Sequence, residues 1–223
     1  MERKGLFFAF EGVDCCGKST QLDKLYLYIK KLDKYQDVLT TREPTSLANE
    51  IKKRLQTELD AFSGGARMAY LYTTDRAQHS QEITSYLEQE NRKIILCDRY
   101  AMSTLGHQGA QGMDLGELWK MHSDLKVIPP DLTIFIDISA KTGIERAQSR
   151  GKPLEKFESP EFFPRMVEKY LEIALISEPS PMIRSITGRI VKIDGERDES
   201  AVFEDVKKAF HSVYDPWKKS MSS

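Results

Sequence analysis

Apolar residues along the chain follow two different spacings. Stretches with apolar residues three and four positions apart lie between short runs rich in strand-forming residues, at residues 5–12, 37–44, 93–100, 131–139 and 189–195. The spacing of Leu22, Leu25, Ile29 and Leu32 is typical of a helix that buries one face. Short strands that alternate with such helices predict parallel strands joined by crossover helices.

The third and fourth runs each contain a nearly continuous apolar stretch. The sequences KIILC (residues 93–97) and LTIFIDI (residues 132–138) suit strands that are covered on both faces. A long helix is predicted from Arg67 to Glu90, and Val202, Val206, Phe210 and Val213 predict a last helix that packs on the sheet. The pattern therefore predicts an α/β fold of three layers around a five-stranded parallel sheet.

Length and composition set the domain organisation that we expect. The chain has 223 residues, of which 40% are hydrophobic, and this is enough to fill one core. No repeat, low-complexity tract or long linker divides it. We expect a single domain over residues 1–223.

Charge and cysteine content narrow the classes of partner. The 33 Lys and Arg nearly balance the 34 Asp and Glu, so a nucleic-acid partner is not expected. No apolar run approaches the ~18 residues that span a bilayer, and the N-terminal apolar run is too short for a signal peptide. Three cysteines form no disulfide framework or zinc-site spacing. We expect a soluble cytoplasmic protein without a membrane partner.

One segment does not fit the alternation of strands and helices. Residues 149–165 (SRGKPLEKFESPEFFPR) are rich in charge and carry proline and glycine near their start. This composition predicts a mobile loop rather than a core element.

A phosphate-binding motif follows the first predicted strand. Residues 12–19 (GVDCCGKS) match G-x-x-x-x-G-K-S/T and precede an amphipathic helix. In this motif, the P-loop, backbone N–H groups surround the phosphates, Lys18 reaches the β and γ oxygens, and Ser19 ligates Mg²⁺. The motif predicts nucleotide binding but does not choose among GTPases, motor ATPases, binding modules and phosphotransferases. An N-K-x-D motif, expected of a small GTPase, is absent from the sequence.

An ordered set of further segments resembles the thymidylate kinase family. These segments are FEGVDCCGKST (10–20), TTREPT (40–45), YLYTTDRAQHS (70–80), CDRYAMSTLGHQG (97–109), PDLTIFIDIS (130–139) and FFPRMVEKYLEIA (162–174). The resemblance runs from about Gly5 to Asp194. It implies the P-loop NTPase fold with a lid over the phosphates, at about residues 149–162 here. It also implies transfer of phosphate from MgATP to dTMP, and a homodimer with contacts around residues 64–90.

The resemblance also implies residues for the two phosphate sites. ATP would be bound by Gly12, Val13, Asp14, Cys15, Cys16, Gly17, Lys18, Ser19 and Thr20. Arg42 and Arg99 would hold the acceptor phosphate, and Asp14 would lie near that phosphate, the sugar or its metal. An acidic side chain in an anion-binding loop requires a cation or hydroxyl partner. Asp98 would organise Mg²⁺ with Ser19, or would simply anchor Arg99.

A second group of residues corresponds to the family's base and sugar contacts. Arg76 matches an arginine that reads the thymine O4, and Tyr72, one helical turn before it, matches a stacking aromatic residue, unless it is an ordinary core residue. Ser103, Thr104 and Gln108 match a polar face near the base. Tyr170 matches a tyrosine near the sugar, although helix packing explains it nearly as well. His107 departs from the family because a tyrosine is usual there, and packing or hydrogen bonding is its expected role.

Cys15 occupies the position at which some family members carry a catalytic arginine. The missing charge predicts that the lid supplies it, with Arg150 as the catalytic arginine beside Lys18, Arg99 and Asp14. Lys152 and Lys156 are possible helpers, and Arg146 is a further lid cation. The alternative is a merely solvated charged loop. Beside Lys18 and a helix N-terminus, the thiols of Cys15 and Cys16 are expected to have a lowered pKa.

Two alternative functions remain open at this point. Tyr72 and His107 would allow another acceptor such as dUMP or a purine deoxynucleotide. A nucleotide-binding homologue with little or no turnover is the second alternative, which the retained Lys18, Arg76 and Arg99 disfavour.

Overall fold

A computed structural model describes residues 4–45, 48–58, 60–89 and 93–220. The elements follow one another as β1 (Leu6–Glu11), α1 (Lys18–Leu32), β2 (Asp37–Arg42), α2 (Asn49–Thr57), α3 (Gly65–Leu87), β3 (Lys93–Asp98), α4 (Ala101–Ala110), α5 (Leu115–Asp124), β4 (Leu132–Asp137), α6 (Ala140–Ser149), α7 (Phe163–Ser177), α8 (Pro181–Thr187), β5 (Arg189–Asp194) and α9 (Glu199–Ser220). In the described part of the chain this confirms the alternation of strands with helices.

The five strands of the described residues form one parallel sheet in the order β2-β3-β1-β4-β5. Every residue of β1 and β3 is buried, as their apolar sequences predict, whereas the edge strand β2 is partly exposed. In the register of the sheet, Arg42 pairs with Asp98, which in turn pairs with Phe10. The residues that follow these positions therefore meet at the carboxyl edge of the sheet.

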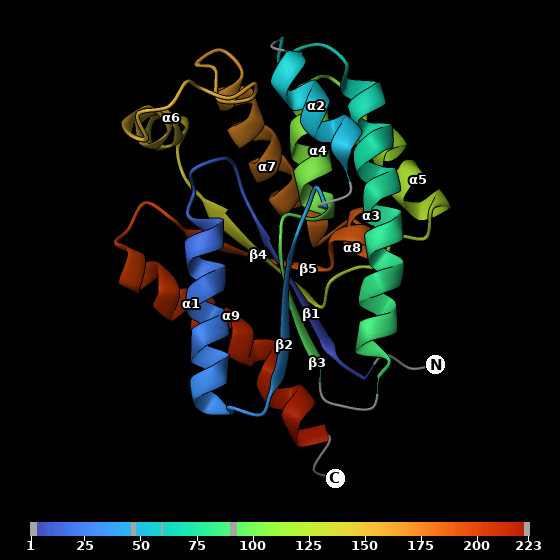
Figure 1. Cartoon of the computed structure of the whole chain (residues 1–223), viewed down its shortest axis with the longest axis vertical. Helices are drawn as coiled ribbons and strands as arrows, with labels where there is room; N and C mark the ends of the chain where they lie inside the picture. The colour runs from blue at the N-terminus through green and yellow to red at the C-terminus, as the bar shows by residue number, and fades with distance from the viewer. Residues whose placement is uncertain (1–3, 46–47, 59, 90–92, 221–223) are drawn as a thin grey trace.

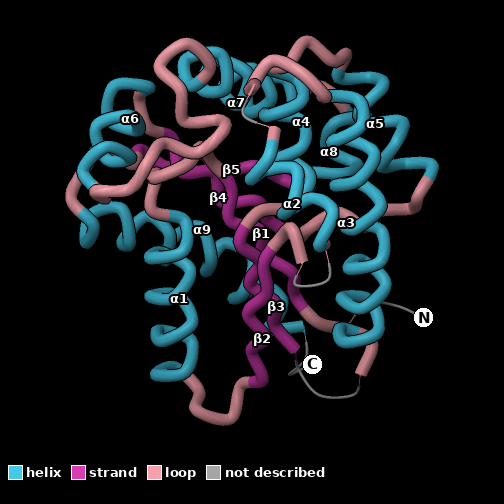
Figure 2. The backbone as a smooth tube through the Cα atoms, turned by 45° about the horizontal axis from the view of Figure 1, so that its top comes forward, coloured by secondary structure: helices cyan, strands magenta, loops and turns pink. Residues whose placement is uncertain are grey.

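Helices cover both faces of the sheet, which confirms the three-layer fold (Figure 1). Helices α1 and α9 pack together on one face, and α3, α4 and α7 cover the other with α5 and α8 outside them. The loop between β1 and α1, helix α2 and the segment between α6 and α7 gather at the carboxyl edge, at the top of Figure 1 and nearest the viewer in Figure 2. No helix of the described residues is long and apolar enough to cross a membrane.

Two helices differ from the predicted pattern. Leu32 was predicted on the buried face of the first helix but is 45% exposed, because it is the last residue of α1 and lies beyond the sheet. The predicted helix from Arg67 to Glu90 begins two residues earlier, at Gly65, and ends at Leu87. Glu90 itself lies outside the described residues.

The segment between α6 and α7 has no regular structure, as predicted, but it is not merely a surface loop. Phe157 and Phe162 are buried in the main core, and their rings pack 5.4 Å apart. Glu158 and Lys156 are buried as well. The expectation of a loop outside the core over residues 149–165 is therefore wrong for Phe157, Phe162 and Phe163, which belong to the core, and residues 163–165 already lie in α7.

Candidate active site

The P-loop joins the end of β1 to the start of α1, the position that a phosphate cradle requires. Gly12 has φ 140°, and a Cβ there would lie 2.5 Å from the carbonyl oxygen of Ile136, so only glycine fits. The Lys18 ammonium is buried and donates to the carbonyl oxygens of Gly12 at 3.0 Å and Val13 at 2.7 Å. These contacts hold the lysine charge over the loop.

The residues expected to bind ATP separate into two groups. A cavity of about 420 Å³ is lined by Asp14, Cys15, Gly17, Lys18, Ser19 and Thr20 of the P-loop together with Arg42, Asp98, Arg99, Arg146, Arg150 and Glu155. Val13 and Cys16 are core residues, 2% and 3% exposed. Their side chains pack in the hydrophobic core and thereby fix the loop to the domain.

The expectation of a lowered pKa is wrong for Cys15. Burial and the nearby Glu158 carboxylate raise the pKa of its thiol to about 11, despite the Arg150 charge. The thiol donates to Glu158 Oε1 at 3.7 Å, a contact that favours the protonated form. All three cysteines are free, so Cys15 and Cys16 form no vicinal disulfide.

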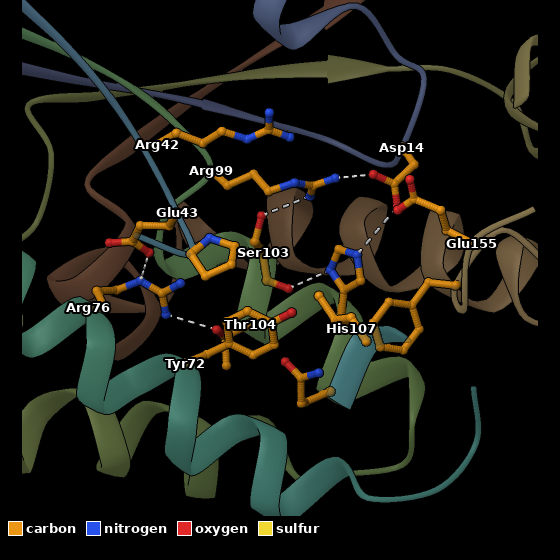
Figure 3. A pocket seen from close by; sticks show the side chains of 14 residues that line it. Asp14, Arg42, Glu43, Tyr72, Arg76, Arg99, Ser103, Thr104, His107 and Glu155 are labelled. Carbon is orange, nitrogen blue, oxygen red and sulfur yellow. Dashed lines mark hydrogen bonds and ion pairs between the residues drawn. The ribbon is translucent and has the colours of Figure 1, made fainter. Parts of the chain in front are cut away.

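Asp14 and Arg99 form an ion pair where β3 ends beside the P-loop (Figure 3). Arg99 also donates to the Ser103 hydroxyl at 3.2 Å, and its backbone lies in the left-handed region with φ 72°, which is unusual for a residue with a side chain. Burial alone would raise the pKa of Asp14, but Arg99, His107 and Lys18 lower it well below its ordinary range. The expectation that Asp14 has a cationic partner is confirmed.

Glu11, which sequence reasoning missed, supports this arrangement from beneath. Its fully buried carboxylate accepts from the backbone N–H groups of Tyr100 at 2.8 Å and Ser103 at 3.0 Å, and from the Ser103 hydroxyl at 2.6 Å. Helix α4 has no cap from its own first residue, so Glu11 caps it from another strand. The signal for it was an acid at the end of an otherwise apolar strand.

Asp98 contacts Ser19 rather than Arg99. The Ser19 hydroxyl donates to Asp98 Oδ2 at 2.5 Å, and Asp98 Oδ1 is buried without a hydrogen-bond partner in the described part of the chain. A hydroxyl and a carboxylate with a free oxygen are hard ligands that suit Mg²⁺, which usually completes its shell with phosphate and water. The pair fits a P-loop metal, although no cluster of three His, Cys, Asp or Glu side chains occurs in the described residues.

A second cavity, of about 140 Å³, lies on the other side of Arg99 (Figure 3). It is lined by Asp14, Arg42, Glu43, Pro44, Leu55, Tyr72, Arg76, Arg99, Ser103, Thr104, His107, Gln108, Glu155 and Phe157. Most of the predicted base and phosphate contacts therefore meet in one place. The unpredicted lining residues are Glu43, Pro44, Leu55, Glu155 and Phe157, to which neither the P-loop motif nor the family resemblance assigned a role.

Arg76 is held in this cavity by a buried polar network. Its guanidinium is 1% exposed and donates to Glu43 at 2.6 Å and to both Thr104 and His122 at 2.8 Å. The other oxygen of Glu43 contacts His79 at 2.9 Å. His122 donates from Nδ1 to a backbone carbonyl, so its Nε2 accepts from Arg76 and the ring is neutral. Glu43 and His122 contact Arg76 directly, and His79 contacts Glu43. They escaped sequence analysis because only the fold brings the end of β2, helix α3 and helix α5 together.

Tyr72 lines the cavity one turn before Arg76, and burial raises the pKa of its hydroxyl to about 12. Tyr72 therefore belongs to the site, and the alternative of an ordinary core residue is wrong. Tyr170, in contrast, is fully buried behind Ser103, to which it donates at 3.2 Å, and does not line the cavity. Its ring packs on Phe135 and over Gly106, where a Cβ would lie 2.3 Å from the ring.

His107 fills its place by hydrogen bonding and packing, as expected. Its Nδ1 lies 2.8 Å from the Ser103 carbonyl oxygen, its Nε2 lies 4.0 Å from Asp14, and its ring meets the Phe157 ring edge-on. Burial and the Arg99 charge lower the pKa of His107, although Asp14 opposes the shift. The ring therefore lies between Asp14 of the P-loop and Phe157 of the lid segment.

The lid residues differ sharply in where they lie. Arg150 and Arg146 line the phosphate cavity, and Arg146 also donates to the Cys15 carbonyl at 3.3 Å. Lys152 is exposed and lines neither cavity. Lys156 turns the other way, with its buried ammonium 3.8 Å from Glu58 and close to the Phe157 ring. The structure therefore brings the two arginines to the P-loop and leaves both lysines outside.

Comparisons with known proteins agree with this geometry. The family described as Thymidylate kinase matches residues 10–193. The thymidylate kinase of Wolbachia pipientis is 31% identical over 207 residues, covering 91% of this chain and 96% of the relative. That of Geobacillus sp. is 34% identical and covers 90% and 93%. A probable thymidylate kinase of Pyrococcus horikoshii is 32% identical and covers 77% and 83%. The chain belongs to the thymidylate kinase family.

Proposed function

We propose that the protein transfers the γ-phosphoryl group of ATP to dTMP and releases dTDP and ADP. The observation that carries the proposal is that the P-loop cavity and the smaller cavity share Asp14, Arg42, Arg99 and Glu155. An acceptor phosphate between them would lie against the donor phosphate. Phosphoryl transfer depends chiefly on such in-line positioning and on neutralisation of charge.

The cations around the P-loop cavity would neutralise the transferred group. Lys18 would contact the β and γ oxygens, Arg99 and Arg42 would hold the acceptor phosphate, and Arg150 would approach the γ-phosphate from the lid. Because the acceptor is an ionised phosphate, no general base is required. Asp14 remains a carboxylate at neutral pH, since its pKa is lowered, and keeps Arg99 between the two cavities.

Mg²⁺ belongs to this proposal as the partner of ATP. The Ser19 hydroxyl and the Asp98 carboxylate would hold it, and its positive charge would offset the negative charge of the donor phosphates.

The smaller cavity would take the thymidine part of dTMP. Tyr72 offers a ring face for stacking, Arg76 offers only hydrogen-bond donors, and Thr104 and Gln108 supply further polar atoms. Arg76 would read a base oxygen, because the Glu43 and His122 contacts leave its guanidinium no freedom to turn away.

We extend the proposal to the organisation of the protein. Residues 1–223 would form one thymidylate-kinase-like domain, as a single core cluster supports. Three free cysteines suit the reducing cytoplasm.

A homodimer would use α3, on which Tyr70 is 62% exposed. Light scattering on the purified protein tests the dimer, because a monomeric mass would contradict it.

The experiment that tests the activity measures ADP release from MgATP with dTMP, dUMP, dGMP and dCMP in parallel. We expect turnover with dTMP to exceed that with the other three. A higher turnover with dUMP or dGMP than with dTMP would contradict the assignment of dTMP as the acceptor. If no acceptor supports turnover while ATP raises the melting temperature, the protein binds nucleotide without acting as a kinase.

A further inference from the structure

Two glutamine side chains form a chain of hydrogen bonds beside the smaller cavity, which Gln108 lines. Gln111, which follows α4, donates from Nε2 to the carbonyl oxygens of Ala61 at 2.7 Å and Ser63 at 2.8 Å. A carbonyl oxygen only accepts, so the amide nitrogen of Gln111 has to face these two residues. Its amide oxygen, Oε1, is thereby directed to the opposite side.

The orientation of Gln111 determines that of Gln108. Gln108 donates from Nε2 to Gln111 Oε1 at 3.2 Å. If the Gln108 amide were reversed, two oxygen acceptors would face each other, so only one of its two orientations is compatible with Gln111. Gln111 therefore selects the orientation of a neighbour that it contacts through one hydrogen bond.

The consequence lies inside the cavity. Gln108 is fully buried, lines the cavity, and its Oε1 has no hydrogen-bond partner in the described part of the chain. A buried acceptor without a partner is destabilising unless a ligand donates to it. The cavity thus contains a fixed acceptor on Gln108 together with the donors of Arg76.

We propose that Gln111 is a positioning residue that sets base selectivity by holding the Gln108 amide oxygen toward the acceptor base. The inference rests on the proposed function. A pyrimidine with a 4-keto group presents an acceptor, O4, next to an N–H donor, and complements an arginine beside an amide oxygen. Cytosine presents the opposite pair, an amino donor next to a ring nitrogen acceptor, and meets like groups at both places. Gln111 therefore discriminates keto from amino pyrimidines without touching the base.

The competing explanation is that Gln111 only anchors the loop at residues 61 and 63. An anchor would affect all acceptors alike, because it would shift the wall of the cavity without altering which atom of Gln108 faces it. Selectivity between bases is the readout that separates the two roles.

The experiment compares kcat/KM for dTMP, dUMP and dCMP in the wild-type protein and in Gln111→Met, which removes both the amide oxygen and the amide nitrogen at similar side-chain length. We expect the preference for dTMP over dCMP to fall by roughly tenfold, because the Gln108 amide becomes free to reverse. The preference for dTMP over dUMP stays unchanged, since both bases have the same 4-keto edge. Gln148→Met on the exposed surface of α6 is the matched control and keeps all three values.

A second variant separates the loop contact from the Gln108 contact. Gln111→Glu retains an oxygen acceptor for Gln108 Nε2 but loses the donors to Ala61 and Ser63. We expect its kcat/KM to fall for every acceptor while the preference for dTMP over dCMP persists. Should the Met variant not fold, a lost preference in the Glu variant still overturns the proposal.

The outcomes identify which claim fails. Equal losses for all acceptors in Gln111→Met show that Gln111 is a loop anchor and overturn the inference, with the proposed function intact. Absence of dTMP-dependent ADP release in the wild-type protein overturns the proposed function itself.

Discussion

Glu158 binds Arg150 through both oxygens of its carboxylate, each 2.6 Å from the Nη2 atom of the arginine. The carboxylate is fully buried and also accepts from the backbone N–H of Glu155 at 2.8 Å. Arg150 itself is partly exposed and lines the P-loop cavity. The lid thus carries its own anchor for the arginine that faces the phosphates.

We predict that Glu158→Gln lowers kcat by about tenfold, which corresponds to about 1.4 kcal/mol, with a smaller effect on KM for dTMP. The amide cannot hold both N–H groups of the guanidinium, so Arg150 loses its fixed direction. Steady-state kinetics measure the effect, and Glu161→Gln on the exposed side of the same segment is the control.

A double-mutant cycle tests whether Glu158 acts through Arg150. Arg150→Ala is expected to lower kcat by roughly 10³-fold, and adding Glu158→Gln to it should cost little more. Additive losses would mean that Glu158 has an independent role.

Cys15 is predicted to react slowly with thiol reagents at neutral pH. Because its pKa is raised to about 11, only on the order of 10⁻⁴ of the thiol is ionised at pH 7. Activity should therefore survive iodoacetamide at pH 7, and labelling of Cys15, followed by mass spectrometry, should accelerate steadily up to pH 10. Rapid labelling at pH 7 would show that the Glu158 carboxylate does not control this thiol.

The sequence allowed the fold and the outline of the site to be predicted, because both depend on local pattern. Short runs of strand-forming residues identified the strands, and P-loop spacing placed Lys18 and Ser19. Support from distant elements was not predictable. Glu11 lies 92 positions before Ser103, and Glu158 lies 143 positions after Cys15. Neither acid belongs to a recognised contact of the family, and only the register of the sheet and the course of the lid bring them to the site.

The positions of the lid cations were likewise not contained in the charge pattern of the sequence. Arg150, Lys152 and Lys156 are equivalent as charges in a sequence, yet only Arg150 reaches the P-loop cavity. Packing of Phe157 and Phe162 in the core determines which way each neighbouring side chain points. Charge pattern alone does not contain that information.

Asp98 is predicted to control the dependence of the reaction on Mg²⁺. Asp98→Asn removes the charge next to Ser19 while keeping a group that accepts from its hydroxyl. We expect the Mg²⁺ concentration for half-maximal rate to rise severalfold at saturating dTMP, since metal binding weakens when a ligand charge is lost. Titration of Mg²⁺ at fixed ATP measures this. An unchanged titration curve with a lower maximal rate would assign Asp98 a role other than metal binding.

Stability below neutral pH is predicted to depend on His122. Burial and the adjacent Arg76 charge lower the pKa of its ring to about 3 in the folded protein, against an ordinary value of about 6.5. Between these two values the unfolded chain binds a proton that the folded protein excludes, so the free energy of unfolding falls as the pH falls from about 6.5 toward 3. The loss from this group approaches about 1.4 kcal/mol per pH unit.

Urea unfolding at pH 7, 6 and 5 measures this effect in the wild-type protein and in His122→Gln, whose amide oxygen replaces Nε2 as the acceptor for Arg76. The variant is expected to be less stable at pH 7, because it loses the contact with the Leu118 carbonyl oxygen. Between pH 7 and pH 5, however, its free energy of unfolding should fall less than that of the wild type. Parallel falls in the two proteins would show that other groups cause the acid sensitivity, because Gln has no proton to bind in this range.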